Sequence, residues 1–133
     1  MPAVTVLVPR DHMDRTDLVR FMRNVKQAVA EHMDAINPET GEMTQFGADP
    51  DKFIDLVLLP YDSDYADLTT PYLGTIVSYA WPNRMESIGT RVASIANQVR
   101  RGFTIDMEER FPKGAELISF TFLGKAPGAW AVA

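Results

Sequence analysis

Hydrophobic positions in the first half of the chain follow a strand, helix, strand order. Residues 4–8 (VTVLV) form a β-branched run of strand length. Between residues 14 and 37, hydrophobic residues recur every three or four positions, which predicts an amphipathic helix stopped by the Asn-Pro pair at its end. A polar loop then leads to residues 53–59 (FIDLVLL), which predict a second strand. Each strand is followed at once by a proline, Pro9 or Pro60.

The second half repeats this order. Residues 75–81 (TIVSYAW) predict a strand, and a hydrophobic repeat at helical spacing then runs from residue 85 to 99. Asn83 and Glu86 stand three positions apart, as in a capping box, so we expect this helix to begin at Asn83. Alternation over residues 116–123 (ELISFTFL) predicts the last strand.

Both halves therefore read strand, proline, arginine, helix, loop, strand. The shared order predicts an α+β fold of two tandem β-α-β units, with halves at about 1–60 and 74–133 in a single domain over residues 1–133. Placed side by side, the units give a four-stranded sheet with both helices on one face. The other face of that sheet stays uncovered within one chain, so we expect a homo-oligomer.

Composition narrows the class of protein further. Hydrophobic residues make up 46% and charged residues 23% of the 133, and none of the hydrophobic runs reaches the roughly 20 residues of a membrane helix. The net charge of −5 argues against a nucleic-acid partner, whose phosphates require basic residues. Without cysteines, and with two isolated histidines, the chain offers no familiar metal-ligand pattern and we expect no metal. The first residues lack a basic start and a cleavage site for secretion, so the expected location is cytoplasmic.

Three arginines stand near the ends of predicted strands. Arg84 follows the third strand, and Arg10 holds the equivalent place in the first half. Ligands of open α/β sheets bind at the carboxyl ends of strands, and a guanidinium there can hold a substrate carboxylate. Arg15, just before the first helix, is a third candidate, with a solvated surface role as the alternative.

The start MPAVTVLVPRDHMDRTDLV and the segment TIVSYAWPNRMES carry a family resemblance. A proline directly after the initiator methionine, at the head of the first strand of a duplicated β-α-β chain, resembles the tautomerase superfamily. The start is similar to its macrophage migration inhibitory factor branch, and the second half to malonate semialdehyde decarboxylase. In this resemblance Asp51 corresponds to an acidic residue before the second strand, and the tail LISFTFLGKAPGAW to a closing strand and a loop with Trp130.

Pro2 is the residue on which the functional prediction depends. Removal of Met1 would leave it with a free secondary amine, and an α-amino group titrates near ~8 in peptides. Burial and nearby cations would lower this pKa, so that the neutral amine could remove a proton alpha to a carbonyl. A proline that stands second without chemical significance is the alternative.

The resemblance implies a cofactor-independent tautomerase for a small 2-oxo acid, in a homo-oligomer with a trimer favoured. Pro2 would be the base, with Arg84 and Asp51 as further catalytic residues. Arg10, Arg15, Tyr79 and Trp130 would bind the substrate. The same site could instead decarboxylate or hydrate a 3-oxo acid, and an oligomeric binding module without catalysis is the alternative of another class.

Overall fold

Four strands form one mixed sheet in the computed structural model, which describes residues 2–10, 12–103 and 117–125. The sheet order is β2-β1-β3-β4, made of β1 (Ala3–Pro9), β2 (Asp55–Tyr61), β3 (Tyr72–Tyr79) and β4 (Ile118–Lys125). The pairs β1–β2 and β3–β4 are parallel, whereas β1 and β3 are antiparallel in the middle of the sheet. The two β-α-β units therefore run in opposite directions, with their first strands adjacent.

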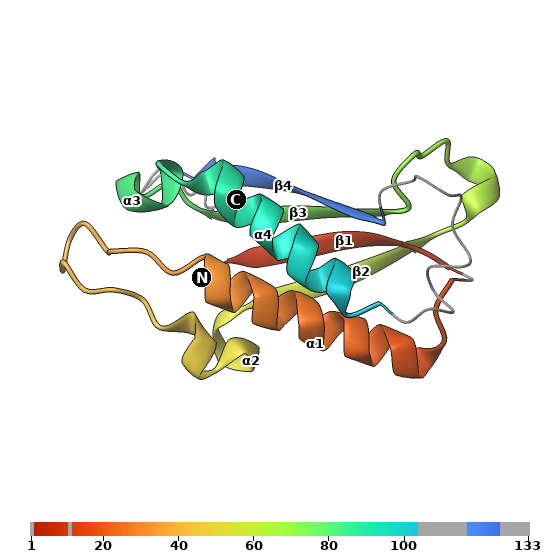
Figure 1. Ribbon diagram of the computed structural model, residues 1–133, viewed down its shortest axis with the longest axis horizontal. Helices are drawn as coiled ribbons and strands as arrows, with labels where there is room; N and C mark the ends of the chain where they lie inside the picture. Colours follow the sequence, from red (N-terminus) through yellow and green to blue (C-terminus); the bar gives the residue numbers. More distant parts are fainter. Residues whose placement is uncertain (1, 11, 104–116, 126–133) are drawn as a thin grey trace, which may run out of the picture.

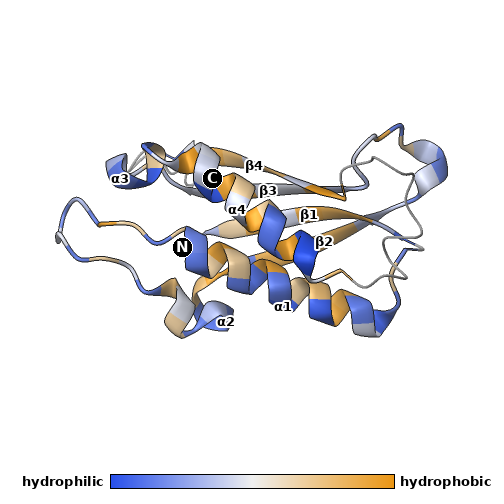
Figure 2. Ribbon diagram, viewed as in Figure 1, coloured by the Kyte–Doolittle hydropathy of each residue, from blue (hydrophilic) through white to orange (hydrophobic). Residues whose placement is uncertain are grey.

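The two long helices, α1 (Arg15–His32) and α4 (Ile88–Arg101), lie next to each other across one face of this sheet (Figure 1). Each buries one hydrophobic face, which includes Phe21, Val25 and Val29 on α1 and Ile95 and Val99 on α4. On the outer surface of both helices hydrophilic residues are interspersed with some hydrophobic ones (Figure 2), such as Val19, which is 51% exposed. The predicted α+β fold of two β-α-β units with both helices on one face is thereby confirmed. The prediction of a single domain over residues 1–133 includes segments outside the described residues and stays a prediction.

Strand alternation decides which side chains meet the helices. Along β1 and β3 the even-numbered residues are buried, and Val4 pairs with Ile76 and Val6 with Gly74 across the two strands. A Cβ atom at Gly74 would collide with the ring of Phe120 on β4, so the missing side chain lets this aromatic ring lie against the sheet. The core is built from these inward-facing strand residues and from the apolar faces of α1 and α4.

The opposite face of the sheet is largely apolar, and we call it the uncovered face because none of the described helices lies on it. It carries Val57 and Leu59 on β2 and Leu123 on β4, whose exposed fractions are 53%, 45% and 53%. Large apolar surfaces of this kind are uncommon on soluble monomers. No described helix is long and apolar enough to cross a membrane.

Several local predictions differ from the structure. The strands predicted at 53–59, 75–81 and 116–123 are shifted by two or three residues, and Pro9 and Pro60 lie within β1 and β2 rather than after them. α1 begins after Asp14, whose side chain caps Asp17 N as one would expect, but the helix ends at His32 rather than at Asn37. The second helix is split into α3 (Pro82–Met85) and α4, because the chain turns at Glu86 and Ser87. Finally, the predicted capping box is wrong.

The side chain of Asn83 explains this last difference. Its Oδ1 accepts a hydrogen bond from Ile36 N at 3.1 Å, and the N-cap of α3 is Trp81. Asn83 thus joins the loop after α1 to the start of α3. The local sequence pattern predicted that Asn83 Oδ1 would cap its own helix, but a tertiary hydrogen bond from Ile36 N uses this acceptor instead. The remaining short elements are α2 (Pro50–Phe53) and the 3-10 turns η1 (Phe46–Ala48) and η2 (Ser63–Tyr65).

Candidate functional site

Pro2 is buried at the end of the sheet where β1 and β2 begin and β3 ends. Its carbonyl accepts a hydrogen bond from Asp55 N at 3.2 Å, which fixes it beside β2. The strand registers pair Ala3 with Asp55 and with Val77, so one step further Pro2 is level with Ile54 on one side and Ser78 on the other. Even-numbered positions of β1 face the helices, and Pro2, Ile54 and Ser78 are all buried, as this alternation leads one to expect for Pro2.

Arg84 lies at this same end of the sheet and is 1% exposed. Its Nε and Nη2 donate to the carbonyl of Met33 at 3.0 and 2.6 Å, and its Nη1 donates to Ser78 Oγ and the carbonyl of Tyr79, both at 2.8 Å. The guanidinium also lies 5.2 Å from the ring centre of Trp81. Four of its five N–H donors are therefore committed to the protein itself.

These contacts give Arg84 an electrostatic and structural role at the Pro2 end. Burial and the neighbouring charge of Arg91 lower the pKa of Arg84 to about 10, while Asp34 acts in the opposite direction. A group with that pKa is still cationic at neutral pH. Arg84 thus places a positive charge next to Ser78, while its committed donors leave little capacity for a bidentate grip on a carboxylate.

Arg91 completes the cluster from α4. Its Nη1 donates to the carbonyls of His32 and Asp34 at 2.9 and 2.6 Å. Together the two arginines satisfy carbonyls at and just beyond the end of α1, where helix carbonyls lack backbone partners and where positive charge is favoured. The Asp34 carboxylate in turn accepts from the Thr44 hydroxyl at 2.7 Å and from Phe46 N at 3.0 Å. This network locks the segment that follows α1 against the Pro2 end of the sheet.

Asp51 lies in α2, four residues before β2 begins at Asp55, and hence towards the Pro2 end of the molecule. Its side chain is 91% exposed and pairs with Lys26 Nζ of α1 at 3.3 Å. Within the described part of the chain, its hydrogen bond and ion pair go to Lys26 and not to Pro2 or Arg84. Its catalytic role stays a prediction.

Tyr79 ends β3 and is half-buried. Its ring stacks on that of Trp81, with centroids 5.6 Å apart and an angle of 6° between the planes. An odd-numbered residue of β3, it lies on the uncovered face and pairs with Lys125. Trp130, the other predicted aromatic wall of the site, lies outside the described residues.

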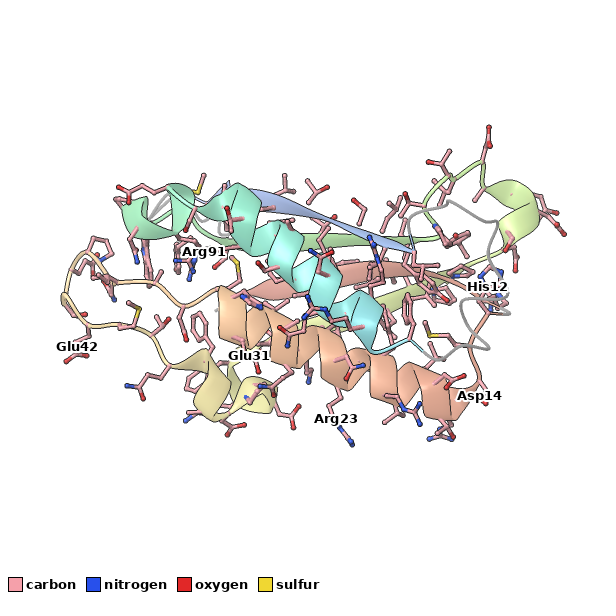
Figure 3. All side chains as sticks on the ribbon, viewed as in Figure 1. His12, Asp14, Arg23, Glu31, Glu42 and Arg91 are labelled. Atoms are coloured by element: carbon pink, nitrogen blue, oxygen red, sulfur yellow. The ribbon has the colours of Figure 1, made fainter. Side chains whose placement is uncertain are left out.

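Arg10 and Arg15 occupy the other end of the sheet. Arg10 follows β1, its backbone N–H bonds to Tyr61 O at 2.9 Å, and its Nε pairs with Asp62 at 3.0 Å. Eight residues of extended chain separate Pro2 from Arg10, which corresponds to roughly 25 Å. Figure 3 shows the two ends by their labelled residues, with Arg91 at the Pro2 end and His12 and Asp14 at the Arg10 end. Within one chain Arg84 therefore lies at the same end of the sheet as Pro2, whereas Arg10 and Arg15 lie at the other end.

Two surface hollows lie away from Pro2. One, of about 460 Å³, lies over the first half of α1 and is lined by Arg15, Thr16, Val19, Arg20 and Arg23. The other, of about 320 Å³, lies between α4 and the start of β4. Among the described residues, no group of three or more His, Asp or Glu side chains is placed to hold a metal ion.

Ser78 and Arg91 are the members of this end that the sequence analysis did not single out. Ser78 stands in the middle of a strand pattern, and its place beside Pro2 depends on the register between two strands 70 residues apart. Arg91 is one of many charged residues on a helix surface in the sequence. The alternation of β3 could have shown that Ser78 faces inward, since Tyr72, Gly74 and Ile76 share its face.

Comparisons with known proteins support the fold through structure rather than sequence. Neither protein-family models nor curated protein sequences give a match. Among solved structures, FG41 malonate semialdehyde decarboxylase inhibited by 3-bromopropiolate aligns with a TM-score of 0.59 at 12% identity, over 98% of this chain and 88% of that one.

Two further solved structures extend the likeness. A symmetric trimer of wild-type fused 4-OT aligns with a TM-score of 0.61 at 10% identity, over 93% of this chain and 85% of its own. The macrophage migration inhibitory factor of Toxoplasma gondii aligns with a TM-score of 0.56 at 14% identity, over 98% and 96% of the two chains. The fold is thus shared with tautomerases, with decarboxylases and with migration inhibitory factor. This chain has the fold of the tautomerase superfamily.

Proposed function

We propose that this protein is a cofactor-independent tautomerase of small 2-oxo acids, with Pro2 as the general base after removal of Met1. The observation that carries the proposal is the burial of Pro2 level with Ser78, to which the cationic Arg84 is hydrogen-bonded at 2.8 Å. Ile54, 1% exposed, is level with Pro2 on the other side. A base, a cation and an apolar neighbour thus share one end of the sheet.

This environment favours the neutral amine. Burial disfavours the charged form of Pro2, and a cation nearby disfavours it further, so both effects lower its pKa from the value of about 8 for a free α-amino group. Of the other charged residues at this end, Arg91 and Asp34 act on the charge of Arg84, Asp55 and Lys125 pair with Ala3 and Tyr79 on the uncovered face, and Asp51 pairs with Lys26. Arg84 is the charged side chain that hydrogen-bonds to Ser78, the residue level with Pro2.

The proposed reaction needs no co-reactant. Pro2 nitrogen takes a proton from the carbon next to the 2-oxo group, the C–H electron pair forms the C=C bond, and the carbonyl π pair moves to oxygen. The prolinium then gives its proton to that oxygen and yields the enol. Positive charge from Arg84 stabilises the developing oxyanion. Loss of carbon dioxide from a 3-oxo acid would pass through a similar enolate, and so the assay should also follow carbon dioxide release.

Intact mass and kinetics test this proposal together. The mature protein should lack one methionine, and its rate of phenylpyruvate tautomerisation should rise with pH through a value below about 8. Pro2→Ala should lose roughly 100-fold or more in kcat/KM, because general base catalysis contributes on that scale. Pro38→Ala, at an exposed proline after α1, is the matched control and should keep full activity. A retained Met1, or equal rates for wild type and Pro2→Ala, would refute the base and favour a binding module.

We further propose that copies of this chain associate through the uncovered face of the sheet, as a trimer. The exposed Val57, Leu59 and Leu123 supply the apolar surface, and two fused 4-OT structures with this fold are described as trimers. Arg10 and Arg15 could reach a Pro2 site only from a neighbouring copy. Val57→Lys should shift the mass measured by light scattering towards the monomer. Val19→Lys is the control, since Val19 is equally exposed, at 51%, on α1. An unchanged mass for both variants would contradict this interface.

A further inference from the structure

Ser78 has an unusual environment for a strand serine. It is 4% exposed, and its Oγ accepts a hydrogen bond from Arg84 Nη1 at 2.8 Å. A hydroxyl that accepts from a guanidinium still has its own proton to donate. Among the described residues, the hydrogen bonds of Ser78 include no acceptor for that proton. A buried donor without an acceptor is costly, so this proton is available to a ligand that brings an oxygen.

The position of Ser78 relative to Pro2 indicates which atom of a ligand its hydroxyl proton could reach. The antiparallel register of β1 and β3 ends at the pair Ala3–Val77, and continuing it by one position sets Pro2 opposite Ser78; both residues are buried. Side chains directly opposite each other in such a pair have Cβ atoms about 5 Å apart. A planar three-atom unit, formed by the α-carbon, the carbonyl carbon and the carbonyl oxygen of a 2-oxo acid, fits between a base and a donor at this separation.

Arg84 makes the hydroxyl a better donor. Donation from a cation to Ser78 Oγ polarises the O–H bond, and in a buried site linked hydrogen bonds strengthen each other. Because four of the N–H groups of Arg84 are already committed, its charge can act on a substrate through Ser78 without a direct contact. Gly124, which pairs with Ser78 on β4, is exposed at the edge of the sheet.

We propose that Ser78 is a catalytic residue that donates its hydroxyl hydrogen bond to the carbonyl oxygen of the substrate while Pro2 removes the neighbouring proton. This inference rests on the proposed function of Pro2. The serine keeps its proton throughout: the hydrogen bond shortens as the oxygen becomes an enolate, and the proton that reaches the oxygen is the one that Pro2 removed from carbon. Arg84 is the positioning residue that holds the hydroxyl and supplies charge through it.

Ser78→Ala tests the donor. A hydrogen bond that strengthens in the transition state affects kcat, and loss of one such donor typically costs about 100-fold or more. We therefore expect kcat for phenylpyruvate to fall by about 100-fold with KM changed by less than about threefold, and Ser78→Thr, which keeps a hydroxyl, to recover most of the rate. Ser119 pairs with Leu73 at the opposite end of β3 from Ser78. Ser119→Ala is therefore the matched control and should leave kcat unchanged.

Folding is checked by circular dichroism and urea unfolding of each variant. If Ser78→Ala does not fold, Ser78→Cys keeps a side chain of similar size with a weak donor and should show the same loss of kcat. A kcat of at least half the wild-type value in folded Ser78→Ala or Ser78→Cys overturns the proposal, as does a loss confined to KM. Should those variants be active while Pro2→Ala is not, Ser78 is refuted and the Pro2 base stands. If wild type itself shows no Pro2-dependent activity, both proposals fail.

Discussion

The two ends of the sheet carry the same sequence feature, a strand followed by proline and arginine, in different surroundings. At one end Arg84 is 1% exposed and donates four hydrogen bonds to the protein. At the other, Arg10 pairs with Asp62, and the two side chains are 57% and 54% exposed. The same motif thus gives a buried polar cluster at the Arg84 end and a surface ion pair at the Arg10 end.

The helix ends account for the difference. Arg84 meets the segment after α1, whose carbonyls need donors. The equivalent place for Arg10 is the end of α4, where Arg100 and Arg101 already occupy the last turn and Gly102 N bonds to Val99 O. Arg10 pairs with Asp62 instead. The two strand-end arginines therefore differ in their partners, which are carbonyls after a helix for Arg84 and a surface carboxylate for Arg10.

Replacing each arginine by methionine should give the largest contrast. Arg84→Met leaves the carbonyls of Met33 and Tyr79 and the Ser78 hydroxyl without their charged donor, so we expect the free energy of unfolding to fall by about 3 kcal/mol. Arg10→Met removes an exposed pair and should cost less than about 1 kcal/mol. Urea unfolding of both variants measures this contrast, and equal losses would break the comparison.

Alkaline pH should act on the Arg10 end through Tyr61. Its hydroxyl donates to Pro71 O at 2.7 Å, and burial raises its pKa above the usual 10. Above pH 10 the unfolded chain releases this proton before the folded one does, so the stabilising contribution is present below pH 10 and is lost as pH rises through the folded pKa. Tyr61→Phe should lower stability by about 1 kcal/mol at pH 8, and less at pH 11. Unfolding measured at both pH values would contradict this if the loss stayed constant.

Substitution of Asp51 should have the smallest effect on stability. Its effect on kcat can therefore be separated from an effect on folding. Its ion pair with Lys26 is at the surface, so Asp51→Asn should change the free energy of unfolding by less than about 0.5 kcal/mol. A fall in kcat of tenfold or more in this variant would then reflect a role at the Pro2 end. Glu39→Gln, a charge removal in the exposed loop after α1, is the control for a general effect of lost negative charge.

Much of the fold could be predicted because its signals are local. The β-branched run of β1 and the three-to-four residue period of α1 each specify an element within a short window, and the order of elements specified two β-α-β units. The end of α1 and the cap of α3 were missed because tertiary contacts decided them. Arg84 and Arg91 take the carbonyls after His32, and Asn83 bonds to Ile36 N rather than to its own helix.

The local patterns of the sequence specify two β-α-β units with one hydrophobic face per helix, and they indicate Pro2 and Arg84 as candidate functional residues. The packing of the strands and helices placed both at one end of the sheet and Arg10 at the other. The reason is the antiparallel pairing of β1 and β3, which places the start of one strand beside the end of the other. Hydrophobic periodicity reports which side of an element is buried, whereas the direction and register of strands 70 residues apart depend on how whole surfaces pack together.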